Sequence, residues 1–183
     1  PNAGIDALKK QIVEKLRLKN KIDATTDQIF VTNGAMNGLY TLFQCLVGEG
    51  DEVILPDPMW TEIAENVKLA GGVPVKVGMF KDNGAFGYNA EEIAKAITPR
   101  TVAIFVNSPQ NPTGVKLKDS ELKAIVALAK ERGLWLAADE AYEDIQFTPA
   151  EFFIGSDPYE KIVSLFSMSK SHNMSGLRVG YMV

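Results

Sequence analysis

The chain has 183 residues, of which 46% are apolar and 23% charged, a composition typical of one globular domain with a sizeable core. Its 19 basic and 23 acidic residues give a formal charge of -4 without a long block of either sign, which argues against nucleic acid or an anionic membrane as a partner. The single cysteine and single histidine exclude an internal disulfide, a Cys/His zinc site and a Ser-His-Asp triad, so no metal site is expected.

The sequence contains no obvious targeting segment. No apolar run approaches the roughly 20 residues that span a bilayer, and the first residues lack the basic-then-apolar order of a signal peptide, so a cytoplasmic location is expected. Cys45 lies in an apolar stretch and is expected to be packed and inert. His172 is expected to be a partly exposed loop residue.

Apolar periodicity divides the chain into alternating helices and strands. Apolar residues at helical spacing predict helices at 5–18, 35–47, about 60–70, 90–97 with Asn89 as the cap, and 118–132. Short apolar runs predict strands at 27–32, 51–55, 73–79, 101–106, 134–138, 161–166 and 179–183, with a polar loop up to Gly87 and a looser stretch at 145–159. This alternation predicts one α/β domain in which helices flank a mostly parallel sheet in three αβα layers.

A polar loop at 167–178 separates the last two predicted strands and carries Lys170. Taken alone, Lys170 is a solvated surface residue. At a strand end it is expected to be held rigidly, and a lysine desolvated near other cations loses its proton readily and can form a Schiff base with a carbonyl. The hydroxyls of Ser167 and Ser169 and the Arg178 guanidinium suit a phosphate. An aldehyde and a phosphate on one small molecule indicate pyridoxal phosphate as the cofactor.

Two other regions carry candidate binding residues. Gly34, Ala35 and Met36 stand where a helix begins, and free N–H groups there can bind a phosphate, although an ordinary turn has the same pattern. Asp139 ends a run of five apolar residues, so its carboxylate is expected to be buried beside a cation; alternatively it caps the following turn. Trp60 can stack on a planar ligand or fill the core.

Two motifs resemble a known family. Ser167-Met168-Ser169-Lys170, followed by Gly176-Leu177-Arg178-Val179-Gly180-Tyr181, resembles the lysine segment of the fold-type I pyridoxal-phosphate enzymes, in particular the class I aminotransferases. Asn111-Pro112-Thr113-Gly114 resembles the cofactor loop of the same family, and its prolines are expected to impose extended backbone that turns the Asn111 amide out of a strand end.

The resemblance implies a role for each candidate position. Lys170 is the covalent anchor and the general acid/base, Asp139 pairs with the protonated ring nitrogen, and Tyr142 hydrogen-bonds the ring oxygen. Asn111 bonds the same oxygen, and Trp60 stacks on the ring. The phosphate is assigned to Gly34, Ala35, Met36, Ser167, Ser169 and Arg178. Glu140 is expected to point away from the site.

The resemblance also implies an activity, the transfer of an amino group between an amino acid and a 2-oxo acid by a homodimeric parent protein. A β-lyase with the same cofactor residues is an open alternative. Family members extend into a smaller domain whose arginine binds the substrate carboxylate, and Arg17, Arg100 and Arg132 do not replace it convincingly. Residues 1–183 are therefore expected to be the cofactor-binding large domain, without the small C-terminal domain and the N-terminal segment. Alone, it would be a non-catalytic cofactor-binding fragment.

Overall fold

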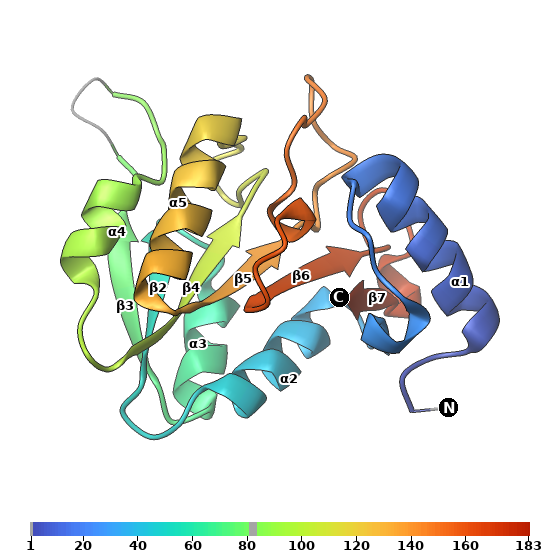
Figure 1. Cartoon of the computed structure of the whole chain (residues 1–183), viewed down its shortest axis with the longest axis horizontal. Coiled ribbons are helices and arrows are strands. Elements are labelled where there is room, and N and C mark those ends of the chain that lie inside the picture. The colour runs from blue at the N-terminus through green and yellow to red at the C-terminus, as the bar shows by residue number, and fades with distance from the viewer. Residues whose placement is uncertain (1, 81–83) are drawn as a thin grey trace.

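The computed structural model describes residues 2–80 and 84–183, and in this part of the chain one seven-stranded sheet forms the centre of an α/β fold (Figure 1). The strand order is β1-β7-β6-β5-β4-β2-β3. The strands are β1 (Phe30–Thr32), β2 (Glu52–Asp57), β3 (Val73–Gly78), β4 (Thr101–Asn107), β5 (Trp135–Asp139), β6 (Ile162–Ser167) and β7 (Gly180–Met182). β6, β5, β4, β2 and β3 pair in parallel, which confirms the predicted mostly parallel sheet.

Helices cover both faces of the sheet. α2 (Ala35–Leu46) and α3 (Thr61–Leu69) pack on one face, and α4 (Ala90–Ala96) and α5 (Asp119–Arg132) pack on the other (Figure 1). Successive side chains of a strand point to opposite faces, so Phe105 of β4 joins the α2 and α3 core while its neighbour Ile104 joins the α4 and α5 core. The continuous apolar run in β4 reflects this burial on both faces.

α1 (Asp6–Lys15) packs beside β6 and β7 at one side of the sheet. Ile12 and Leu16 form a separate small core with Phe166 of β6 and Tyr181 of β7, whose rings stack at 4.9 Å between centroids. The backbone continues as a π-helical turn over Leu16–Asn20, two residues beyond the predicted end of the helix.

β7 runs antiparallel to both of its neighbours, β6 and β1. The segment between β6 and β7 contains only a short 3-10 turn, Ser175–Leu177, and so lacks the crossover helix that usually joins parallel strands.

β1 is shorter than the predicted strand at 27–32. The residues Thr26–Gln28 form a 3-10 turn, because the side chains of Thr25 and Gln28 bond to backbone N–H groups there instead of leaving them for a sheet.

The expectation that Cys45 is packed is wrong, since its side chain is exposed. The buried residues of α2 include Leu39, Leu42 and Phe43, and a helical step of two residues from Phe43 places Cys45 on the opposite face. The Asn89 cap of α4 is confirmed by a 2.8 Å hydrogen bond that its side chain accepts from the Glu91 N–H group.

Two further points concern the chain as a whole. The expected polar loop before Gly87 falls partly on residues 81–83, which lie outside the described residues. Among the helices of the described ranges, none has the length and apolar character required to cross a membrane.

The strand order reverses direction between β2 and β4. From β2 the chain moves outward to β3, whereas β4, β5 and β6 follow one another toward the other edge. Open α/β sheets bind ligands at such a switch point, beyond the carboxyl ends of the strands. The segments after β2, β4, β5 and β6 therefore converge on one potential binding region.

Candidate functional site

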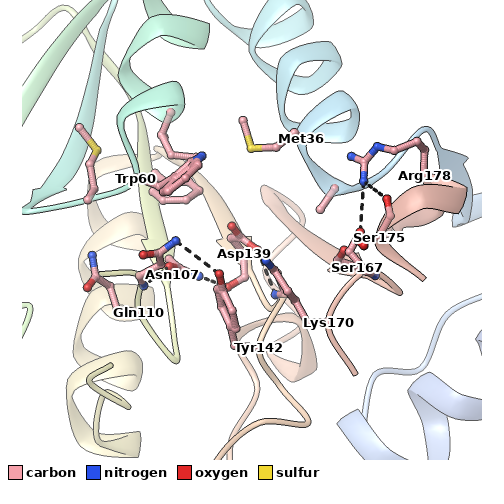
Figure 2. A pocket seen from close by; sticks show the side chains of 17 residues that line it. Met36, Trp60, Asn107, Gln110, Asp139, Tyr142, Ser167, Lys170, Ser175 and Arg178 are labelled. Carbon is pink, nitrogen blue, oxygen red and sulfur yellow. Dashed lines mark hydrogen bonds between the residues drawn. The ribbon is translucent and has the colours of Figure 1, made fainter. Parts of the chain in front are cut away.

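A cavity of about 310 Å³ opens at this switch point (Figure 2). It lies within the 300–1,000 Å³ range that is common for small-molecule sites. With the exception of Gly34, every residue predicted for the cofactor lines it. These lining residues are Ala35, Met36, Trp60, Asn111, Asp139, Tyr142, Ser167, Ser169, Lys170 and Arg178.

One end of the cavity is formed by the first turn of α2. Gly34 is the N-cap residue, with a φ of 81°, and no side chain caps the helix there. The first N–H groups of α2 therefore remain available to an anion, and the helix dipole adds partial positive charge. An ideal Cβ on Gly34 would lie 2.3 Å from Arg178 Nη2, so the absence of a side chain is what allows the guanidinium to approach.

Hydroxyl groups and a cation gather beside this helix start. Arg178 Nη1 donates hydrogen bonds to Ser169 Oγ at 3.3 Å and to the Ser175 carbonyl oxygen at 2.9 Å. The Ser169 N–H group donates to Ser167 Oγ at 3.1 Å. Together they form a set of donors suited to a phosphate group.

Asp139 ends β5, lines the cavity and is half-buried. Its Oδ1 accepts a 3.0 Å hydrogen bond from the Ala141 N–H group, so the alternative interpretation, in which Asp139 caps the following turn, is confirmed. Burial raises the pKa of the Asp139 carboxyl to about 6, although the Ala141 hydrogen bond and the Lys170 charge act in the other direction. A cation placed against Asp139 would therefore bring its pKa down again.

Lys170 lies in the turn at 169–172, just beyond the end of β6. Its Nζ is 5.5 Å from the centroid of the Tyr142 ring. The expected desolvation of Lys170 is not found, because the turn projects past the strand and leaves the side chain exposed at the rim of the cavity. Figure 2 shows Lys170 and Tyr142 on one side of the cavity and Trp60 on the other.

The Asn111 side chain donates a 3.3 Å hydrogen bond to the Tyr142 hydroxyl oxygen, so two residues predicted to contact the same ring oxygen are neighbours. The backbone from Asn111 to Thr113 forms a turn rather than the expected extended segment. Its bonds to Asn107 and Gln110 explain this difference, since they draw the loop back onto the end of β4. Trp60 is 48% exposed, so it is not the core-filling residue of the alternative interpretation.

Three polar lining residues were not predicted. Asn107 ends β4 and bridges two segments: its Nδ2 donates to the Asp139 carbonyl oxygen at 3.0 Å, and its Oδ1 accepts from the Asn111 N–H group at 2.9 Å. Gln110 donates to the Pro58 carbonyl oxygen at 2.7 Å and so links the loops after β2 and β4. Ser175 contributes its carbonyl oxygen to Arg178. Asn107 could have been found as a polar residue that ends a buried apolar run, the signal that identified Asp139.

Comparison with known proteins agrees with this arrangement. The family model "Aminotransferase class I and II" matches residues 1–183. Among curated relatives, the aspartate aminotransferase of Bacillus sp. (strain YM-2) is 40% identical over 185 residues, which cover 99% of this chain and 47% of that protein. The probable aspartate/prephenate aminotransferase of Aquifex aeolicus is also 40% identical, with 99% and 47% of the two chains covered. This chain thus spans about half the length of the curated relatives it matches.

Solved structures give the same result. Thermus thermophilus aspartate aminotransferase with maleate superposes with a TM-score of 0.95 at 37% identity, covering 100% of this chain and 47% of that chain. An alanine aminotransferase from Pyrococcus furiosus has a TM-score of 0.93 at 31% identity, covering 99% and 46%. The chain belongs to the class I and II aminotransferase family.

Proposed function

We propose that this protein transfers an amino group between an amino acid and a 2-oxo acid with pyridoxal phosphate as cofactor, and that residues 1–183 form its cofactor-binding large domain. The observation that carries the proposal is the cavity, where residues predicted for one cofactor meet from segments as distant as α2 and the turn at 169–172. A homodimeric assembly and a cytoplasmic location go with this proposal and are not needed for its test.

The residues present fit the cofactor. The end formed by Ala35, Met36, Ser169 and Arg178 offers N–H, hydroxyl and guanidinium donors, as a phosphate dianion requires. Asp139 also lines the cavity, and the raised pKa of its half-buried carboxyl reflects desolvation without sufficient positive charge beside it. A protonated ring nitrogen placed there would supply that charge.

When bound, pyridoxal phosphate supplies an aldehyde that reacts with amines and a ring that accepts the electrons released at the substrate Cα. Lys170 then has two tasks. Its Nζ would be the nucleophile that holds the cofactor, and as a free amine it would also accept the proton from the substrate Cα. Asp139 would keep the ring nitrogen charged, while Asn111 and Tyr142 would hold the ring oxygen. Trp60 limits the ring's movement on one side.

The first test is to locate the anchor. The protein is mixed with pyridoxal phosphate, reduced with borohydride and digested, and the modified peptide is identified by mass spectrometry. We expect one label per chain, on Lys170, and loss of both the label and the visible absorbance in Lys170→Ala. The control is Lys123→Ala on α5, which removes a lysine that lies over the Phe152 ring and should leave the label unchanged. Labelling of another lysine would contradict the proposal.

The second part tests the reaction class. The cofactor-loaded full-length protein, rather than residues 1–183 alone, is mixed with a panel of amino acids that includes aspartate, which the names of several relatives specify. Without a second 2-oxo acid, amino transfer predicts one equivalent of 2-oxo acid per bound, unreduced cofactor and no ammonia. Release of ammonia together with pyruvate from a cysteine conjugate would instead favour the lyase chemistry.

A further inference from the structure

Gln110 connects the loop after β4 to the loop after β2, which carries Trp60 (Figure 2). It lines the cavity although it is only 3% exposed. Its Nε2 donates a 2.7 Å hydrogen bond to the Pro58 carbonyl oxygen, and its Oε1 accepts from the Thr113 N–H group at 3.0 Å and from the Thr113 hydroxyl. Both ends of this buried amide are therefore paired, which offsets the cost of burying it.

The main chain of Gln110 is also held in place. Its N–H group donates to the Val115 carbonyl oxygen at 2.9 Å, and its carbonyl oxygen accepts from the Gly114 N–H group at 2.8 Å. The next residue, Asn111, donates its 3.3 Å hydrogen bond to the Tyr142 hydroxyl oxygen. This short segment therefore contacts both sides of the cavity, the Trp60 loop through the Gln110 side chain and Tyr142 through Asn111.

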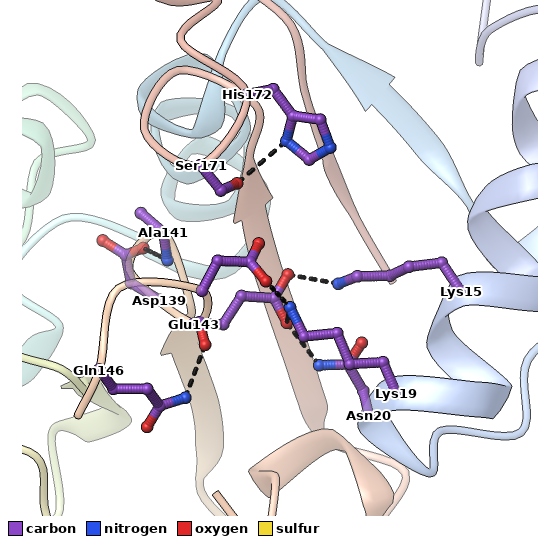
Figure 3. A network of polar contacts seen from close by, with 10 residues as sticks. Lys15, Lys19, Asn20, Asp139, Ala141, Glu143, Gln146, Ser171 and His172 are labelled. Carbon is purple, nitrogen blue, oxygen red and sulfur yellow. Dashed lines mark hydrogen bonds and ion pairs between the residues drawn. The ribbon is translucent and has the colours of Figure 1, made fainter. Parts of the chain in front are cut away.

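The Tyr142 side of the cavity is fixed from behind by the region of α1 (Figure 3). Glu143 directly follows Tyr142 and is buried. Its carboxylate forms an ion pair with Lys15 and accepts a 2.6 Å hydrogen bond from Asn20 Nδ2. A buried ion pair is costly to break, so this side of the cavity is held without help from the loop after β2.

Trp60, on the other side of the cavity, is half-exposed, so packing encloses only part of its ring. It is the N-cap residue of α3, and its side chain makes no capping hydrogen bond there. The loop before it leaves β2 at Asp57, and the bond from Gln110 reaches this loop at Pro58, two residues before the tryptophan. The place of the indole over the cavity therefore depends on the path of a loop that Gln110 holds.

We propose that Gln110 is a positioning residue, which sets the distance between Trp60 and the Tyr142 side of the cavity through its bond to Pro58. The indole is thereby kept at contact distance from a flat ring bound between the two sides. The inference rests on the proposed function, which supplies the ring of pyridoxal phosphate. Contact of this kind is sensitive to distance, because a gap of about 0.5–1 Å already loses roughly a quarter to a half of the dispersion attraction.

The test is a double-mutant cycle in the full-length protein, freed of cofactor. Gln110→Met, Trp60→Ala and the double variant are compared with the unchanged protein, and the dissociation constant of pyridoxal phosphate is measured from the visible absorbance. Methionine has nearly the volume of glutamine but no amide, so the bond to Pro58 is lost without leaving a cavity. We expect Gln110→Met to weaken binding by about fivefold, a loss of the size that an aromatic contact contributes. In the Trp60→Ala background the same change should have no further effect.

A second measurement uses no cofactor. Amide hydrogen exchange of residues 59–63 should be faster in Gln110→Met, because the loop has lost its bond to the segment after β4. Gln110→Asn is a milder variant, which keeps an amide but is one methylene shorter and should not reach Pro58. It should show the same weakening and the same faster exchange, and it replaces Gln110→Met in the cycle if that variant does not fold.

Two variants serve as controls. Thr113→Val removes the hydroxyl that bonds to Gln110 Oε1 but leaves the bond to Pro58, so it should keep the affinity. Gln11→Met makes the same substitution at an exposed position of α1 and should have no effect. Exchange protection of α5 confirms that each variant is folded.

The outcomes separate this inference from the proposed function. Unchanged affinity in both Gln110 variants, equal weakening in Thr113→Val, or fully additive losses in the cycle would overturn the positioning role, while Lys170 stays the cofactor anchor. If the unchanged protein does not bind pyridoxal phosphate, the proposed function fails. The exchange of residues 59–63 then still decides whether Gln110 holds the loop that carries Trp60.

Discussion

The proposed phosphate site depends more on Gly34 than on any other single residue. Its φ of 81° and its place as N-cap leave the α2 N–H groups open, and Arg178 occupies the space that a side chain would need. Arg178 has a positive φ of 52° itself, so two residues far apart in the chain adopt uncommon backbone conformations where they meet. Such conformations cluster at functional sites because the surrounding structure must hold them.

We predict that Gly34→Ala weakens binding of pyridoxal phosphate by roughly 10- to 100-fold, about the value of one hydrogen bond to a charged group. The new Cβ would displace the Arg178 guanidinium from the helix start. The measurement is the dissociation constant from a titration of the visible absorbance.

Gly50→Ala is the matched control for this change. Gly50 also has a positive φ, of 78°, but an added Cβ would meet no atom within 4 Å. Both variants should lose about 1–3 kcal/mol of stability from backbone strain, whereas only Gly34→Ala should lose affinity. Equal dissociation constants for the two variants would show that the approach of Arg178 does not matter for binding.

At the scale of elements, the carboxyl ends of β4 and β5 position the polar side chains of the site. β4 and β5 pair in register from Ala103 with Trp135 to Asn107 with Asp139, so both strands deliver a polar side chain at the same level. Asn107 uses its two polar atoms to bind the main chain of Asp139 and of Asn111. The geometry of two predicted cofactor residues therefore depends on a third residue that need not touch the cofactor.

The sequence allowed the helices, the strands and most of the lining residues to be predicted, because each leaves a local signal. Periodicity marks a helix such as α5, and a polar residue after an apolar run marks a site residue such as Asp139. The antiparallel direction of β7 and the exposure of Lys170 depend on how a loop leaves the sheet, and a local pattern does not encode this. The bonds of Gln110 likewise join segments that only the folded chain brings together.

We predict that Asn107→Ala destabilises the protein by about 1–3 kcal/mol, because it leaves the N–H group of Asn111 without its partner, while the Asp139 carbonyl oxygen keeps only its longer 3.4 Å bond from the Ser108 N–H group. Cofactor affinity should fall as well. Asn107→Asp keeps the acceptor for Asn111 but replaces the donor to Asp139 with a carboxylate oxygen that repels the Asp139 carbonyl oxygen, so it should be no more stable than Asn107→Ala. Chemical denaturation and absorbance titration measure the two effects. An Asn107→Ala variant that binds the cofactor as tightly as the unchanged protein would mean that Asn107 does not position these residues.

At the scale of the whole molecule, four acidic residues lie between the cavity and α1: Asp139, Glu140, Glu143 and Asp144. Asp139 lines the cavity, whereas Glu140 turns away from it and is buried, as expected from strand alternation. Burial, together with the charges of Glu143 and Asp139, raises the pKa of Glu140 to about 8, although Lys15 and Lys19 act against this rise. At neutral pH the folded chain therefore keeps a proton on Glu140 that the unfolded chain has released.

This proton makes the stability of the whole protein depend on pH. Glu140 has a higher pKa in the folded chain than the ordinary 4.5, so the folded state binds more protons between about pH 4.5 and 8, and the free energy of unfolding must fall as the pH rises through that range. The contribution is at most about 5 kcal/mol. Asp139, with a pKa of about 6, adds a fall of the same sign, but only at the acidic end.

We predict that Glu140→Gln removes most of the fall in stability between pH 6 and 8 and makes the protein more stable than the unchanged chain above pH 8. Urea denaturation at a series of pH values measures the free energy of unfolding for both. Glu131→Gln is the matched control, because Glu131 is an exposed residue of α5 that pairs with the adjacent Arg132. That variant should keep the pH dependence of the unchanged chain. The contradicting result is the same slope of the free energy of unfolding against pH, between pH 6 and 8, in Glu140→Gln and Glu131→Gln. That result would mean that Glu140 is already ionised in the folded protein and does not cause the pH dependence of stability.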